Sequence, residues 1–179
     1  MVQYEALPII TLDPKKTNLC TDALPEVMHM DDPALAVMMD FTQAPPKTIL
    51  EDAPIDDALN LMKKHGVHLL FAMNNNDQPV GVIASENILG EGPIKIQQER
   101  RIPRSRITVN MLMEKLKDIP ALDIDAISNF KIGNIVNTLK KHHRHYAVVI
   151  KVNGDDTPMI RGIFTTSQIS QQLHMDIAS

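Results

Sequence analysis

Two stretches of the chain carry hydrophobic residues at the spacing of an amphipathic helix. The apolar positions are Ile55, Ala58, Leu59 and Met62 in the first stretch and Ile132, Ile135, Val136 and Leu139 in the second. Each stretch ends in a Lys-Lys-His run, and cations in the last turn complement the dipole of a helix. Pro54 and Gly66 suit the first turn and the position just after the end of the first helix. The pattern therefore predicts two similar helices far apart in the chain.

Each predicted helix is followed by two short apolar runs that are separated by turn residues. The runs lie at 69–73 and 80–83 after the first helix, and at 146–152 and 160–164 after the second. They are too short for helices and are typical of buried strands, so each pair predicts a hairpin. A polar cap then opens another helix, at Ser85 in the first copy and at Thr165, Thr166 and Ser167 in the second.

A leading strand is expected ahead of each long helix, near 48–50 in the first copy and near 121–124 in the second. A short helical segment is expected before each strand, at 34–41 and at 109–116. The chain therefore contains an internal repeat, which fixes the architecture before any single motif is considered. The predicted fold class is α+β, with the unit strand, helix, strand, strand, helix occurring twice.

The repeat divides the chain into two units, 32–90 and 107–174. The segment 91–106 between them contains glycine and proline and is typical of a linker. Residues 1–31 have no clear period and are expected to form an N-terminal arm, and 175–179 a C-terminal tail.

The composition is that of an ordinary globular protein. The chain has 179 residues, of which 44% are hydrophobic and 22% charged, enough for two small packed units. Its single cysteine, Cys20, excludes an intramolecular disulfide and suits a reducing compartment. The N-terminus lacks the features of a secretion signal, and no apolar run approaches the roughly 20 residues of a membrane helix. We therefore expect a cytoplasmic protein without a membrane partner, and its net charge of −4 argues against a nucleic-acid partner.

No constellation in the sequence indicates catalysis or metal binding. An enzyme needs a nucleophile with an oriented base, paired carboxylates or a metal site, and none is recognisable, so we expect no enzymatic activity. His142, His143 and His145 are imidazoles close together, but adjacent residues leave a helix in different directions and no other ligand has a matching spacing. We predict no metal site there. The five cations of 95–106 favour a solvated linker over a phosphate-binding patch.

With these elements in register, the chain resembles the CBS (cystathionine β-synthase) domain family. In that family the second hairpin strand runs into a Gly-apolar-apolar-Thr/Ser-x-x-Asp motif, and the matching stretches here are 81–87 and 162–168. The resemblance covers about 32–174 and is closest to free-standing bacterial proteins with a tandem pair, called a Bateman module. It implies that the two β-α-β-β-α units pack through their sheets into one pseudo-two-fold module.

The resemblance also implies a regulatory function. Family members bind adenine-containing ligands such as AMP, ADP, ATP or S-adenosylmethionine between the two copies, require no other cofactor, often form homodimers, and signal to a protein partner. The motif glycine lets a ligand approach the strand end, and the helix start that follows favours phosphate. The implied ligand contacts are Gly162, Thr165, Thr166, Gln168, His145 and Tyr146 in the second copy and Thr48, His68, Ser85 and Asn87 in the first.

The motif is altered in both copies. Asn87 and Gln168 replace its aspartate, and Ala84 stands where the first copy should have a hydroxyl residue. Amides still accept hydrogen bonds, so we expect a penalty of about 1 kcal/mol for each altered bond, and the second copy is the better candidate site. Two alternatives stay open. The threonines and Ser85 serve as helix caps only, or the module is a scaffold that dimerises without binding a ligand.

Overall fold

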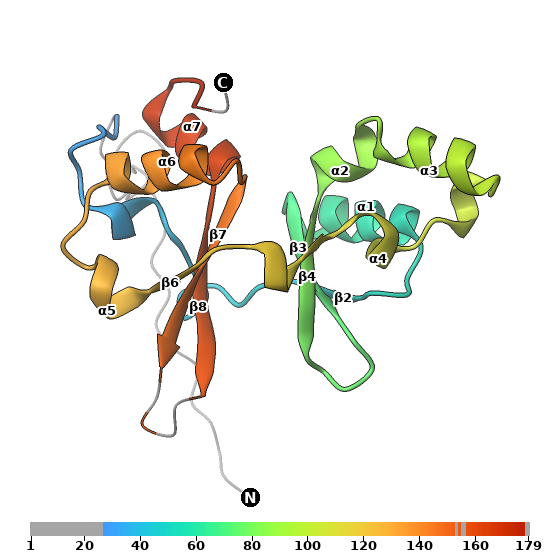
Figure 1. The fold of residues 1–179 in the computed structure, drawn as a ribbon, viewed down its shortest axis with the longest axis horizontal. Helices are drawn as coiled ribbons and strands as arrows, with labels where there is room; N and C mark the ends of the chain where they lie inside the picture. Colours follow the sequence, from blue (N-terminus) through green and yellow to red (C-terminus); the bar gives the residue numbers. More distant parts are fainter. Residues whose placement is uncertain (1–26, 153, 155–156, 178–179) are drawn as a thin grey trace, which may run out of the picture.

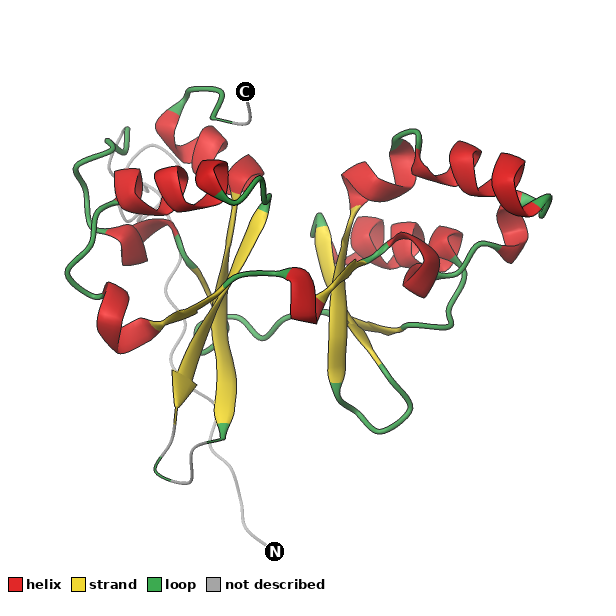
Figure 2. Ribbon diagram, viewed as in Figure 1, coloured by secondary structure: helices red, strands yellow, loops and turns green. Residues whose placement is uncertain are grey.

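The computed structural model describes residues 27–152, 154 and 157–177. Two four-stranded sheets face each other in the middle of the molecule, and the α-helices lie on their outer sides (Figures 1 and 2). One sheet has the order β1-β8-β7-β6 and the other β2-β3-β4-β5. The α+β class predicted from the sequence is confirmed.

The elements have the following bounds. The strands are β1 (Met39–Asp40), β2 (Thr48–Leu50), β3 (Leu69–Met73), β4 (Pro79–Ala84), β5 (Glu114–Lys115), β6 (Ala121–Asp123), β7 (Tyr146–Val152) and β8 (Pro158–Thr165). The α-helices are α1 (Ile55–His65), α2 (Ser85–Leu89), α3 (Gly92–Arg100), α4 (Val109–Leu112), α5 (Ile124–Ile127), α6 (Ile132–Lys141) and α7 (Thr166–Leu173). Short 3₁₀ helices occur at η1 (Ala34–Val37), η2 (Arg104–Arg106) and η3 (Leu116–Asp118).

The predicted repeat is present. The amphipathic helices are α1 and α6, and α1 ends at Gly66, whose left-handed φ of 63° is the conformation that glycine adopts readily. Each hairpin, β3–β4 and β7–β8, is antiparallel, and each leading strand pairs in parallel with the first strand of its hairpin. The second leading strand ends at Asp123, one residue early, because that side chain accepts a hydrogen bond from the Asp125 amide and starts α5.

The segments expected to be helical before each unit are only partly so. Residues 34–41 form η1 and then β1, and residues 109–116 form α4, then β5 and the start of η3. The strands form because partners from the other copy are available: Met39 lies opposite Ile163, and Glu114 opposite Val82. Pairing with a distant strand has overridden local preference, which a reading of nearby residues cannot detect.

The segment 91–106, predicted as a linker, contains α3, which lies at one end of the molecule (Figure 1). Pro93 is in its first turn, where proline's missing amide hydrogen costs no helical hydrogen bond. The helix ends at Arg101, which has a left-handed φ of 52°. The glycine and proline that suggested a loop instead mark the start of a helix.

Each unit buries the segment that precedes the other. Ala34 and Val37 of η1 lie in the apolar core around α6, while Ile107 and Val109 lie in the core around α1. The contiguous units predicted from the sequence, 32–90 and 107–174, therefore exchange their leading segments in space. The exchange ties the two halves together through backbone pairing as well as through side-chain packing.

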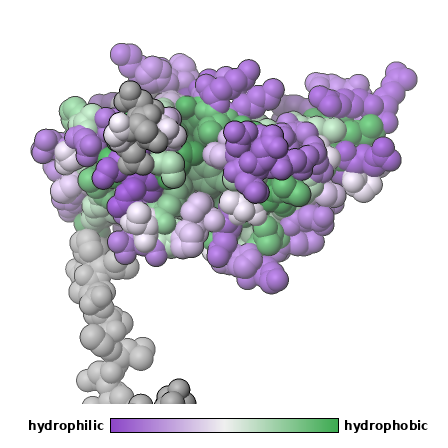
Figure 3. Space-filling model, turned by 90° about the horizontal axis from the view of Figure 1, so that it is seen from below, coloured by the Kyte–Doolittle hydropathy of each residue, from purple (hydrophilic) through white to green (hydrophobic). Residues whose placement is uncertain are grey.

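A third core lies between the sheets. Phe71 and Val82 of one sheet meet Val148 and Ile163 of the other, and all four are buried. Strand alternation explains why β3 is buried on both faces, because Leu70 and Ala72 point toward α1 whereas Phe71 points toward the other sheet. Seen from below, apolar residues reach the surface between polar groups near the middle of the molecule (Figure 3).

The predicted arm and tail are described only in part. Residues 1–26 of the arm and 178–179 of the tail lie outside the described residues. Ile177 of the tail is buried in the core around α6, and its amide donates to the Ser170 hydroxyl at 3.2 Å. Of the helices in the described residues, none has the length and hydrophobicity needed to cross a lipid bilayer.

Candidate functional site

A cleft of about 1140 Å³ opens between the two units. It lies where the strands adjoin α2 on one side and α7 on the other, and these ends of the two hairpins are on the same side of the molecule (Figure 1). The first unit contributes the loop from Gly66 to Leu69 and the start of α2. The second contributes the start of β7, the end of β8 and one face of α7. Both copies of the repeat thus line one cavity.

Four of the predicted contact residues line this cleft: His68, Tyr146, Thr165 and Gln168. His145 and Thr166 line a separate pocket of about 370 Å³ beside the C-terminal end of α6. The residues that line neither pocket are Thr48, Ser85, Asn87 and Gly162. The structure therefore brings four of the ten predicted contact residues to the cleft and places the other six elsewhere.

Thr165 caps α7. Its hydroxyl accepts a hydrogen bond from the Gln168 amide at 3.1 Å, and only 4% of the residue is exposed. The capping alternative is thus present in the structure, although Thr165 also borders the cleft.

The first amide of each motif helix is already bonded. The Thr166 amide donates to the His145 carbonyl at 3.0 Å, and the Ser85 amide donates to the His68 carbonyl at 2.9 Å. The sequence argument assigned the amides at these helix starts to a phosphate. In the structure, each repeat instead uses this amide for a hydrogen bond to the carbonyl of the histidine that precedes its first hairpin strand.

Asn87 also takes part in a cap. Its side-chain oxygen accepts a hydrogen bond from the Ala84 amide at 2.8 Å. This bond occupies the acceptor that the sequence argument offered to a ribose hydroxyl. Gln168, at the matching position of the second copy, faces the cleft.

Each motif glycine lies where a strand from the other repeat pairs with the hairpin, β1 with β8 and β5 with β4. A side-chain carbon at Gly162 would lie 2.6 Å from the Met39 carbonyl oxygen, and one at Gly81 would lie 2.6 Å from the Glu114 carbonyl oxygen. Both distances are far below contact distance. The expectation that Gly162 makes room for a ligand is therefore wrong, because a neighbouring strand occupies that space.

Tyr146 sits where the inter-sheet core meets the cleft and is 5% exposed. Burial raises the pKa of its phenol well above the usual range, and the carboxylates of Glu86 and Glu114 add to the effect. The phenol is therefore neutral at physiological pH and can donate a hydrogen bond.

The remaining lining is rich in amides and poor in charge. Gln171 and Gln172 follow Gln168 by three and four residues, so all three share one face of α7. That spacing is visible in the sequence and could have identified them. The Gln172 side-chain oxygen is buried and has no hydrogen-bond partner among the described residues. Met28, Ala36 and Met39 also line the cleft, but they arrive through the exchanged segment and leave no local signal.

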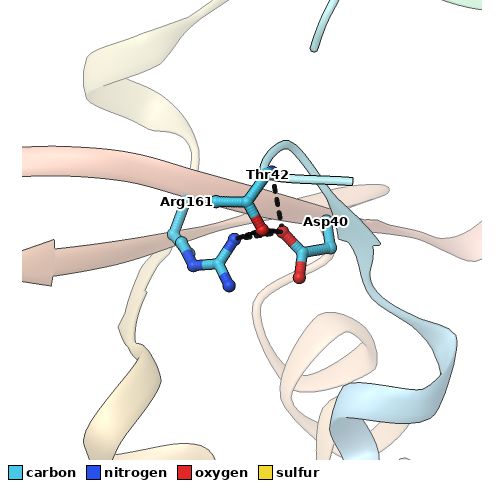
Figure 4. Close-up of polar contacts among 3 residues, drawn as sticks. All are labelled: Asp40, Thr42 and Arg161. Carbon is cyan, nitrogen blue, oxygen red and sulfur yellow. Dashed lines mark hydrogen bonds and ion pairs between the residues drawn. The ribbon is translucent and has the colours of Figure 1, made fainter. Parts of the chain in front are cut away.

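A cluster of polar side chains links β1 to β8, the strand with which it pairs (Figure 4). The Asp40 carboxylate accepts from the Thr42 amide and hydroxyl at 2.8 Å each, and Arg161 donates to Asp40 and to the Thr42 hydroxyl. The bonds from Thr42 lower the pKa of the Asp40 carboxyl, and Arg161 lowers it further against the opposing effect of desolvation. Within residues 27–152, 154 and 157–177, no group of three or more His, Cys, Asp or Glu side chains is arranged to hold a metal ion.

Comparison with known proteins agrees with this geometry. Residues 37–92 match the CBS domain family. This segment is a CBS domain. The second unit repeats its topology, so the chain has the fold of a tandem pair of CBS domains. A comparison with curated proteins finds none that matches the chain.

Three solved structures illustrate the similarity of fold. A conserved CBS domain protein of unknown function from Thermoplasma acidophilum is 19% identical, with a TM-score of 0.52 over 75% of this chain and 68% of that one. A hemolysin-like protein containing a CBS domain from Oenococcus oeni is 20% identical, with a TM-score of 0.52 over 80% of this chain and 91% of that one. CBSX2, solved in complex with AMP, is 16% identical, with a TM-score of 0.50 over 78% of this chain and 94% of that one.

Proposed function

We propose that this tandem pair of CBS domains is a regulatory module whose cleft binds an adenine-containing ligand. The observation that carries the proposal is that both repeats line one cavity of about 1140 Å³, with His68 from the first and Tyr146, Thr165 and Gln168 from the second. Such a concave site with an apolar body and a few polar groups suits a small organic molecule. The AMP bound by CBSX2 supports an adenine compound as the ligand class.

The cleft offers groups suited to the edges of a nucleoside. The neutral phenol of Tyr146 is a donor, and the α7 amides supply donors and acceptors together. The apolar residues Met39, Val67 and Leu69 provide surface against which a base can pack. A ligand held by both units stabilises one arrangement of the two sheets relative to others, to the extent that it binds that arrangement better.

A protein partner that senses this arrangement, a homodimeric assembly and a cytoplasmic setting complete the proposal. The role is binding and not catalysis. Among the described residues, the polar groups at the cleft are amides, hydroxyls, imidazoles and the single carboxylate of Glu86, without a paired nucleophile and base.

A thermal-shift panel of adenosine, AMP, ADP, ATP and S-adenosylmethionine tests the proposal. A ligand at a hundred times its dissociation constant should stabilise the folded chain by about 2.7 kcal/mol. Replacing Gln168 by alanine should weaken binding about fivefold, since one hydrogen bond contributes about 1 kcal/mol. Gln98→Ala, an exposed glutamine on α3, is the matched control and should bind like the parent.

A ligand-free scaffold is the second candidate. The observation in its favour is that Asn87 and Thr165 use their polar atoms inside the protein as helix caps. Absence of any shift across the whole panel, in a chain that unfolds cooperatively, would favour the scaffold and contradict the regulatory proposal.

A further inference from the structure

The cleft has an uneven charge. Among the described residues that line it, Glu86 is the one with a fixed charge, and neither lysine nor arginine is present. Glu86 is exposed and lies in the first turn of α2. Its counterpart in the second repeat is Ser167, which is neutral. In the part of the lining that the structure describes, a ligand therefore meets a carboxylate and neither a lysine nor an arginine.

Backbone amides at the described helix starts do not take the place of lysine or arginine either. At α7 the Thr166 amide bonds to the His145 carbonyl, and the Gln168 amide bonds to the Thr165 hydroxyl. At the start of α2 the Ser85 amide bonds to the His68 carbonyl. An anion at either helix start would have to break these bonds, and a buried amide that loses its partner costs roughly 1–3 kcal/mol.

The cations close to this end of the second unit are directed elsewhere. Arg144 is paired with Glu114 at 3.1 Å. Lys140, His143 and Arg144 line the separate pocket of about 370 Å³ beside α6. Burial, and in addition the carboxylates of Glu86 and Glu114, raise the pKa of the Tyr146 phenol. Among the described residues that line the cleft, Glu86 is therefore not balanced by a lysine or an arginine.

We propose that the cleft selects an adenine nucleoside whose 5′ end is uncharged or positively charged, and discriminates against nucleotide phosphates. This inference rests on the proposed function and narrows its ligand class. Glu86 is the specificity-determining residue, since it repels a phosphate and attracts a cation at the same position. The amides of α7 and the phenol of Tyr146 are neutral and tolerate either.

The test is a series of ligands that share adenosine and differ at the 5′ position. Isothermal titration compares 5′-amino-5′-deoxyadenosine, adenosine and AMP at about pH 7.5, where most free imidazole is neutral and a primary amine is protonated. Adenosine should bind about tenfold more tightly than AMP, and the amino compound should bind at least as tightly as adenosine. Raising the salt concentration should reduce both differences.

Variants at the carboxylate assign the effect. Glu86→Gln should bring AMP and adenosine to within about twofold of each other, and Glu86→Lys should make AMP the tighter ligand. Glu99→Gln, on an exposed site of α3, is the matched control and should keep the parent order. Each variant replaces an exposed side chain, and thermal unfolding without ligand verifies that it is folded.

The outcomes separate this inference from the proposed function. AMP binding as tightly as adenosine to the parent, or an order that Glu86→Gln leaves unchanged, would overturn the charge selection while leaving an adenine site in place. Binding of AMP that is lost when Lys140 is replaced by Met would assign the phosphate to the pocket beside α6 and would also overturn it. Failure of every adenine compound, whatever its charge, would contradict the proposed function itself.

Discussion

At the scale of single residues, the sequence motif predicted the helix cap correctly but not the role of its glycine. Thr165 was expected near a ligand or as a cap, and it caps α7 at the border of the cleft. Gly162 was expected to admit a ligand, but its missing side chain admits the Met39 carbonyl. The motif indicates a position where a side chain does not fit, and the fold determines whether a ligand or a strand occupies the space.

The cluster at Asp40 leads to a pH prediction. Hydrogen bonds from Thr42 and the charge of Arg161 lower the pKa of Asp40 in the folded chain below its unfolded value. A carboxyl of this kind stabilises the fold above its unfolded pKa of about 3.9, and the stabilisation is lost as the pH falls through the folded value. Asp40→Asn should therefore be less stable than the parent at about pH 7, and the difference should shrink below about pH 4.

Urea unfolding of both chains across this pH range provides the measurement. Asp118→Asn, an exposed aspartate of η3, serves as the control for a general change in acidity. A stability difference between Asp40→Asn and the parent that is the same at both ends of the range would show that the charge of Asp40 is not what fastens β1 to β8.

At the level of elements, local periodicity succeeds where an element finds its partners nearby in the sequence. The helices α1 and α6 and the hairpins that follow them agree with the apolar pattern, since each packs on its own neighbours. Residues 34–41 and 109–116 were not predicted correctly because their partners, β8 and β4, belong to the other repeat. The helix α3 was missed because Gly92 and Pro93 resemble a loop until their place in a first turn is known.

Because the leading segments are exchanged, a mutation in one of them should lower the local stability of the other repeat. Val109 belongs to the second repeat by sequence but is fully buried in the core around α1. Val109→Ala should destabilise the chain by about 2 kcal/mol and should speed amide hydrogen exchange in α1 more than in α6. Val37→Ala, in the leading segment that packs on the second unit, should act mainly on α6. If Val109→Ala speeds amide hydrogen exchange more in α6 than in α1, the result would contradict the exchange of leading segments between the two repeats.

The whole molecule is held together by the inter-sheet core and by two strand pairings between the repeats, β1 with β8 and β5 with β4. The cleft is a consequence of that arrangement. Sequence reasoning located two motif regions, and their meeting in one cavity depends on the packing of β3 and β4 against β7 and β8. The lining from Met28, Ala36 and Met39 could not have been predicted, because it depends on where η1 and β1 cross. Because both units line the cavity, we expect the proposed ligand to contact both.

Hydrogen exchange of the parent chain with and without saturating adenosine tests this central claim most directly. The account predicts slower exchange at the starts of β3 and α2 in the first unit and, in the same experiment, at the start of β7 and along α7 in the second. Protection confined to one unit, or to the pocket between Lys140 and Thr166, would contradict a ligand held in the cleft between them.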